Sequence, residues 1–209
     1  MKLIIFGATG MVGKQLVQQA LFKNHHVKAF GRNVYTTDYL QTENLQLVQG
    51  ALFDEGEVYN AINGCDAIVS AIGGASDGTD KARTLGMKNI IKQMQKAGVK
   101  RIVALGGLGV LNAADTGLLI DKDDYPAKYK AVGLEHKKVF EMLNESGLDW
   151  TFVGSPDIIN EGPTGSYITK ADYPPEQNNY KINAGDLAMF MLNELEKNEY
   201  AQHRVGISN

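Results

Sequence analysis

The sequence predicts an α/β domain built on a doubly wound parallel sheet. Short apolar runs bounded by glycine or aspartate alternate with longer stretches of helical periodicity. A loop with three glycines follows the first apolar run directly. The 209 residues, 44% of them hydrophobic and 22% charged, are enough to bury one sizeable core. We therefore expect a single domain over residues 1–209, in which residues 155–183 form a small C-terminal flap.

The apolar runs give the expected strands, and the periodic stretches give the expected helices. The strands are residues 2–6, 26–30, 45–49, 67–71, 101–105 and 150–154, with a late edge strand near 204–207. The assigned helices are residues 11–22, 81–97, 130–146 and 184–196. Gly98 and Gly147 stand where the second and third of these helices should stop, which suits a left-handed C-terminal residue.

The segment between residues 160 and 184 differs in composition from the rest of the chain. Two glycines and three prolines interrupt its polar sequence, and it contains one short strand candidate at residues 166–169. We expect this segment to cover the sheet as the flap.

Charge and composition favour a small-molecule ligand. A net charge of -3 and an isoelectric point near 5.8 give no general attraction to nucleic acid or anionic membranes. The single cysteine, Cys65, excludes an internal disulfide and is expected to be a packed thiol. The four histidines form no metal-ligand pattern, so no metal is expected. No apolar run is long enough to cross a bilayer and no signal segment is evident, so we expect a cytoplasmic protein.

The glycine-rich loop at residues 7–13 predicts a dinucleotide site. Gly7 permits the sharp turn after the first strand, Gly10 lets the backbone approach a pyrophosphate, and Gly13 lets the helix pack on the strand. The amides of the first helical turn, at Met11 and Val12, then face the phosphates, and Thr9 can add a hydroxyl. The alternative is a tight turn without a ligand, which the flanking strand and helix disfavour.

The end of the second strand favours NADP over NAD. An NAD-selective site usually places an acidic residue there, whereas this chain has Arg32 and Asn33. The Arg32 guanidinium offers a planar fork to a 2′-phosphate, and the Asn33 amide can assist it. The alternatives are that Arg32 is an ordinary surface charge or stacks on the adenine.

Several motifs together resemble the atypical short-chain dehydrogenase/reductase superfamily. They are GATGMVG, the strand end followed by GRN, GVKRIVALGGLG, SGLDWTFVGSP and the C-terminal KINAGDLAMFMLNEL. Within that superfamily the chain is most similar to NAD(P)H-binding proteins related to biliverdin reductase B, a flavin reductase, and to NmrA-like regulators. The resemblance covers nearly the whole chain and implies a Rossmann-type fold.

The resemblance also implies further contacts with the cofactor. Ala51 and Leu52, after the third strand, would border the adenine, and Ala71, Ile72 and Gly73 would run under the ribose and pyrophosphate. The segment containing Pro156 would flank the nicotinamide. Two departures matter: Ala51 replaces a common aspartate, and residues 154–156 keep only the proline of a common Arg-Pro pair.

The catalytic residues of the superfamily are incomplete in this chain. Its reductases use a tyrosine, a lysine four residues later and a serine, and those positions fall here on Gly133, Lys137 and the serine-free segment 105–108. Tyr125 or Tyr129 could bring a phenol to the site by another route, or could simply pack the preceding loop. His136 could donate a proton, or could be a surface histidine.

We therefore expect an NADPH-dependent oxidoreductase that reduces a flavin, a quinone or a similar planar acceptor. Such hydride transfer needs a stacked donor and acceptor, and solvent can supply the proton. The main alternative is a non-catalytic NADP(H) sensor of the NmrA-like kind that acts through a protein partner. A nucleotide-sugar epimerase or dehydratase is a third interpretation, for which the chain is short.

Overall fold

The computed structural model describes residues 1–209 and contains one large sheet. Its eight strands run in the order β3-β2-β1-β4-β5-β6-β10-β8, and all neighbours are parallel except β10 and β8. This arrangement confirms the predicted doubly wound α/β fold. The strands are β1 Lys2–Phe6, β2 His26–Gly31, β3 Leu45–Gln49, β4 Ala67–Ser70, β5 Arg101–Gly107, β6 Asp149–Ser155, β8 Ile168–Ala171 and β10 His203–Ser208.

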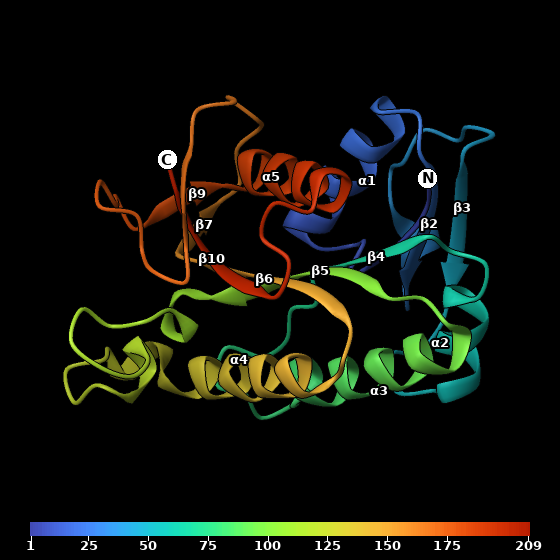
Figure 1. The fold of residues 1–209 in the computed structure, drawn as a ribbon. Helices are drawn as coiled ribbons and strands as arrows, with labels where there is room; N and C mark the ends of the chain where they lie inside the picture. Colours follow the sequence, from blue (N-terminus) through green and yellow to red (C-terminus); the bar gives the residue numbers. More distant parts are fainter.

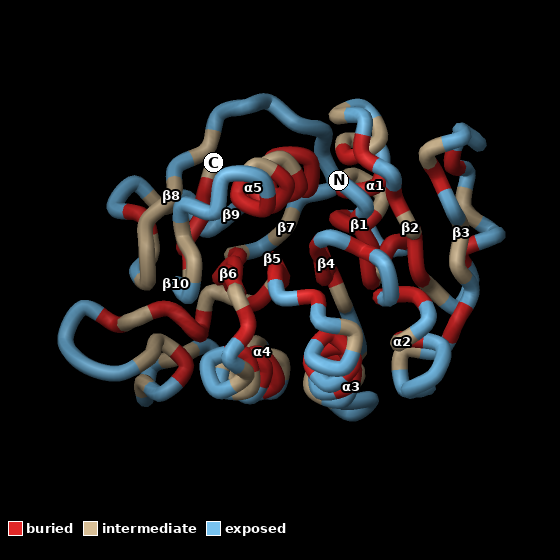
Figure 2. The backbone as a smooth tube through the Cα atoms, turned by 45° about the vertical axis from the view of Figure 1, so that its right-hand side comes forward, coloured by how far each residue is buried: buried red, intermediate tan, exposed pale blue.

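Helices cover both faces of the sheet. Helices α1 (Met11–Phe22) and α5 (Ala184–Lys197) lie on one face, and α2 (Glu55–Ile62), α3 (Ala82–Ala97) and α4 (Ala127–Glu145) lie on the other (Figure 1). Each face buries its own apolar cluster, of 27 and 21 residues respectively. Figure 2 shows the central strands buried between the two helix layers. None of the helices has the length and apolar character needed to span a membrane.

The strand order reverses between β1 and β4, and this reversal positions the site. From β1 the chain builds outward through β2 and β3, and it then returns to pair β4 on the other side of β1, with Phe6 beside Ser70. The loops after β1 and β4 therefore leave the sheet in opposite directions. A crevice at the carboxyl ends of the strands is the usual ligand site of such sheets.

Two expectations about the strands and helices need correction. The last strand, β10, does not lie at the edge: it pairs with β6 in parallel and with β8 in antiparallel, so β8 forms the edge. The flap supplies β8, and this long-range pairing cannot be read from local periodicity. Helix α4 begins at Ala127, three residues before the expected start, with Pro126 as its N-cap, where a missing backbone N–H costs the helix nothing.

The helix ends at Gly98 and Gly147 were predicted correctly. Gly98 has φ +72° and Gly147 has φ +69°, so both adopt the left-handed conformation that ends a helix. Cys65 is buried, as expected for a packed thiol.

Residues 155–183 contain the remaining strands. β7 (Asp157–Ile159) pairs in parallel with β9 (Lys181–Asn183), which leads directly into α5. The buried carboxylate of Asp186 accepts bonds from the amides of Thr164 and Gly165 at 2.7 and 2.8 Å. Burial alone would raise the pKa of Asp186, but a bond from the Thr164 hydroxyl, these two amide bonds and one from Asn209 lower it on balance. The first turn of α5 thus anchors the loop at residues 162–165.

Candidate cofactor and acceptor site

The three glycines of the loop after β1 differ in the space around the position of a Cβ atom. A Cβ on Gly7 would lie 2.3 Å from the carbonyl oxygen of Ala71, and a Cβ on Gly13 would lie 2.0 Å from that of Gly7. A Cβ on Gly10 would meet nothing nearer than 3.4 Å. Packing within the protein therefore requires Gly7 and Gly13, whereas the surface over Gly10 is open to a ligand.

The N-terminus of α1 faces this open surface without a protein partner. Gly10 is the N-cap and no side chain caps the helix, so the first amides are free to bind an anion. Gly10, Met11 and Val12 line a pocket of about 860 Å³. The hydroxyl of buried Tyr39 donates to the carbonyl of Ala8 and holds the loop from behind. These features fit the pyrophosphate of a dinucleotide.

The pocket extends from α1 along the carboxyl ends of β4, β5 and β6 to α4 and the flap. It brings together ten of the residues predicted from the sequence: Gly10, Met11, Val12, Ala71, Ile72, Gly73, Tyr125, Tyr129, His136 and Pro156. Flap residues Pro174 and Tyr180 also line it. A volume of this size accommodates a drug-sized ligand.

The residues predicted for the adenosine end lie outside this pocket. Arg32 and Asn33 are exposed after β2, and the Gln49 side chain donates to the Arg32 carbonyl at 3.0 Å. After β3, the Ala51 amide donates to Glu57, and Leu52 packs so close to Gly86 that a Cβ there would lie 2.2 Å away. Thr9 is exposed in the loop itself. The contacts of the residues after β2 and β3 with adenosine, and the contact of the Thr9 hydroxyl with the phosphates, stay predictions.

Lys137 does not join the pocket. Its ammonium pairs with Asp121 at 2.6 Å, and it is not among the lining residues. The tyrosine position of the superfamily is held by Gly133, which lines the pocket and carries no phenol, and a Cβ there would lie 2.4 Å from Ile120 Cδ1 and 3.3 Å from the Tyr125 hydroxyl. The standard tyrosine–lysine pair therefore has no counterpart in this pocket.

Tyr129 lies in the pocket wall with two charged neighbours. Its hydroxyl donates to the carboxylate of Asp157, with 2.8 Å to each oxygen. The Lys128 ammonium lies 4.4 Å from the centre of the Tyr129 ring, and interaction with this phenol raises the pKa of Lys128. All three residues line the pocket. This group offers a phenol whose proton can exchange with solvent through the exposed Asp157.

His136 is buried in the pocket wall, so the surface-histidine alternative is wrong. Its ring lies beneath Gly107, whose Cβ would be 2.9 Å from the imidazole Cδ2, and it is 8% exposed. Burial, with a smaller contribution from the Arg83 charge, lowers the pKa of His136 to about 3. The imidazole is therefore neutral near pH 7, and it is no source of an imidazolium proton there.

Arg83, in the first turn of α3, lines the pocket and was not predicted from the sequence. Its guanidinium donates to the carbonyls of Ala75 and Gly74 at 3.1 and 3.2 Å. Desolvation lowers the pKa of Arg83. A lone arginine in a helix with no motif around it carries no local signal, and only the fold brings it beside α4.

Fold and pocket together define a dinucleotide-binding α/β protein. The chain belongs to the NAD(P)H-binding family, whose sequence model matches residues 7–198. This match confirms the predicted NAD(P)H cofactor and the resemblance to NAD(P)H-binding proteins.

Individual proteins are similar to this chain over nearly its whole length. The structure of a protein from Burkholderia pseudomallei described as exported is 32% identical over all of both chains, with a TM-score of 0.85. SP1627 from Streptococcus pneumoniae, assigned as an NADH-flavin reductase, is 26% identical with a TM-score of 0.85 and covers 100% of this chain and 99% of its own. The uncharacterised protein YwnB of Bacillus subtilis is 26% identical over 98% of this chain and 96% of its own length.

Proposed function

We propose that this protein is an NADPH-dependent reductase of planar acceptors such as flavins or quinones. The observation that carries the proposal is one continuous pocket that joins the uncapped N-terminus of α1 to an apolar wall formed by Leu105, Pro156 and Ile158. The likeness to a protein assigned as an NADH-flavin reductase supports the same class of acceptor.

One group of pocket residues binds the cofactor pyrophosphate, and another positions the acceptor ring. The amides of Met11 and Val12 hold the pyrophosphate at the positive end of α1. When bound, NADPH supplies a hydride from its nicotinamide, which reduces the acceptor by two electrons. Pro156 and Ile158 present an apolar surface that holds a flat ring in place and excludes water.

Tyr129 provides a hydroxyl proton in the wall of the pocket where the acceptor is proposed to bind. Asp157 orients that hydroxyl and, being exposed, exchanges protons with solvent. Water can replace the phenol for an acceptor that is easily protonated, because proximity alone provides much of the rate. His136 shapes the wall as a neutral ring.

Steady-state oxidation of NADPH tests the proposal, with FMN, riboflavin and a benzoquinone as acceptors. We expect turnover with at least one of them. Tight NADPH binding without turnover across this panel would overturn the reductase proposal. That outcome would favour the NADP(H) sensor, an alternative that the missing tyrosine–lysine pair keeps open.

Tyr129→Phe tests the proposed proton donor. Removal of the hydroxyl should lower kcat with a quinone by about 10- to 100-fold while the KM for NADPH is unchanged. Tyr35→Phe is the matched control, because Tyr35 is exposed and lies outside the pocket. Unchanged kcat in Tyr129→Phe would assign the proton to water alone.

A further inference from the structure

The pocket contains a positive charge that forms no ion pair with a protein carboxylate. Three cationic side chains line it: Arg83, Lys122 and Lys128. Lys122 pairs with Asp115 at 2.6 Å, and Lys128 is exposed above the Tyr129 ring. Arg83 is half-buried, and its two hydrogen bonds go to neutral carbonyl oxygens.

The two acids nearest to Arg83 already have other partners. Asp80 accepts bonds from the amides of Ala75 and Ala82 at 2.9 and 3.1 Å. Glu135 accepts from the Thr84 amide and hydroxyl, and Lys138 lies 3.9 Å from it. Both carboxylates favour the charged form of Arg83, but neither lies within ion-pair distance of it. A partly desolvated cation of this kind gains most from an anion that enters the pocket.

The place of Arg83 separates it from the pyrophosphate loop. The loop and α1 lie on one face of the sheet, whereas α3 and α4 lie on the other (Figure 1). Arg83 belongs to the side of the pocket that holds His136 and Tyr129, and its charge contributes to the lowered pKa of His136. The pocket thus has the uncapped amides of α1 on one side of the strand ends and the Arg83 guanidinium on the other.

We infer that Arg83 is a specificity-determining residue that binds an anionic group, a phosphate or a carboxylate, on the planar acceptor. The two carbonyl bonds fix the plane of the guanidinium, and its remaining N–H groups serve the ligand. The inference rests on the proposed reductase function for the identity of the acceptor. It assigns the Arg83 side of the pocket to the acceptor and the N-terminus of α1 to the cofactor.

Matched acceptor pairs test the inference by binding as well as by turnover. FMN and riboflavin differ by a phosphate, and a carboxylated benzoquinone differs from its parent by a carboxylate. Dissociation constants of the flavins are measured on the NADP⁺-loaded protein by quenching of flavin fluorescence, and KM values are measured for all four compounds. We expect the wild type to prefer the anionic member of at least one pair by about tenfold or more.

Arg83→Gln should reduce that preference to near one while the binding of the neutral member is unchanged. Arg83→Lys, which keeps the charge, should retain part of it. Lys88→Gln is the control, since it removes an exposed positive charge from the same helix outside the pocket. Circular dichroism and thermal unfolding check that each variant is folded.

Two results would overturn the inference. One is a wild type that binds and reduces the charged and neutral members of both pairs equally. The other is an Arg83→Gln variant that weakens NADPH binding and leaves the acceptor preference intact, because Arg83 would then serve the cofactor. A preference for FMN in binding without turnover would support the anion position and count against the reductase proposal alone.

Discussion

Among single residues, Gly10 is the position at which a substitution should affect NADPH binding without affecting stability. The space above it accepts a Cβ, unlike the space at Gly7 and Gly13. Gly10→Ala should therefore fold with a melting temperature within a few degrees of wild type, yet weaken NADPH binding by about tenfold or more, because the methyl group occupies the approach of the pyrophosphate.

Fluorescence titration with NADPH and a thermal melt measure the two effects separately. Gly13→Ala is the comparison variant, and it should lose stability because its Cβ would overlap the Gly7 carbonyl. Full NADPH affinity in Gly10→Ala would place the pyrophosphate elsewhere.

Arg32 carries the prediction of cofactor preference. It is exposed at the end of β2, and its guanidinium is free to bind a 2′-phosphate. Arg32→Ala should weaken NADPH by about 10- to 100-fold, in keeping with about 1.5 to 3 kcal/mol for a charged hydrogen bond. NADH affinity, measured in the same titration, is the internal control. An equal loss for both cofactors would remove the role in 2′-phosphate recognition.

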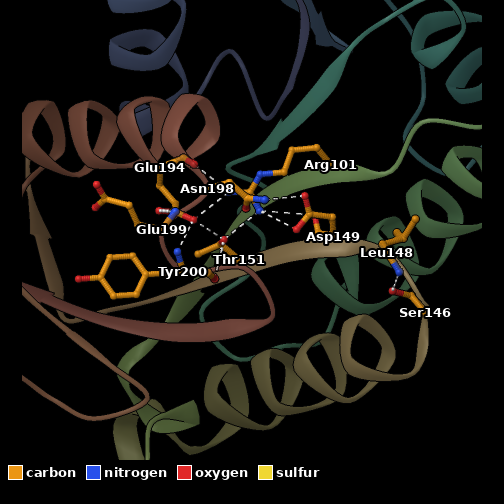
Figure 3. A network of polar contacts seen from close by, with 9 residues as sticks. All are labelled: Arg101, Ser146, Leu148, Asp149, Thr151, Glu194, Asn198, Glu199 and Tyr200. Atoms are coloured by element: carbon orange, nitrogen blue, oxygen red, sulfur yellow. Dashed lines mark hydrogen bonds and ion pairs between the residues drawn. The ribbon is translucent and has the colours of Figure 1, made fainter.

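At the level of elements, one buried ionic network ties α5 to the sheet (Figure 3). Arg101 on β5 donates to Glu194 on α5 at 2.9 Å and to Thr151 on β6 at 3.0 Å. Thr151 in turn donates to Glu194 at 2.8 Å. The side chain of Glu194 is 1% exposed and that of Arg101 is 10% exposed. The network joins the far end of α5 to the strands whose opposite ends form the pocket.

Glu194→Ala should destabilise the protein by about 3 kcal/mol, because it removes the buried carboxylate of Arg101 and leaves only the partly exposed Asp149, 3.6 Å away, to balance the guanidinium. The double variant Arg101→Met/Glu194→Leu should recover most of that loss. Urea unfolding, followed by the fluorescence of the single tryptophan, Trp150, measures both.

Glu176→Ala serves as the control for this network. It breaks an exposed ion pair with Lys170 and should cost less than about 1 kcal/mol. A double variant no more stable than Glu194→Ala would show that the ion pair itself, and not the unpaired charge, sets the cost.

For the molecule as a whole, His136 links global stability to pH. The folded state keeps this imidazole neutral until about pH 3, whereas an unfolded chain protonates it near its ordinary value of about 6.5. Protons therefore favour the unfolded state between those values, so stability falls as the pH drops through this range. The contribution is at most about 1.4 kcal/mol per pH unit.

Urea unfolding at several pH values between 7.5 and 4.5 measures this dependence. His136→Gln should flatten it relative to wild type, and His26→Gln, which removes an exposed imidazole, should not. Parallel curves for wild type and His136→Gln would show that the folded protein protonates His136 readily.

Local sequence was enough to predict most of the fold because its signals are local. Periodicity located the strands of the large sheet and helices α1, α3, α4 and α5 within a few residues, but it missed the short helix α2 and strands β7 and β9. The glycine loop located one end of the pocket. The prediction was weakest where partners are distant in the chain. β10 became an interior strand because β8 pairs beyond it, and the buried state of His136 depends on Gly107, 29 positions before it in the sequence.

The sequence by itself determined the doubly wound sheet, the glycine-rich loop at the head of α1 and the absence of the usual tyrosine and serine. Each of these depends on residue type at short spacing, which the chain carries without folding. Only the tertiary structure decided that Lys137 pairs with Asp121, that Tyr129 meets Asp157, and that Arg83 reaches the pocket without a carboxylate partner. Those outcomes depend on burial and on contacts between elements that are distant in the sequence, because electrostatic interactions act between side chains that are close in space.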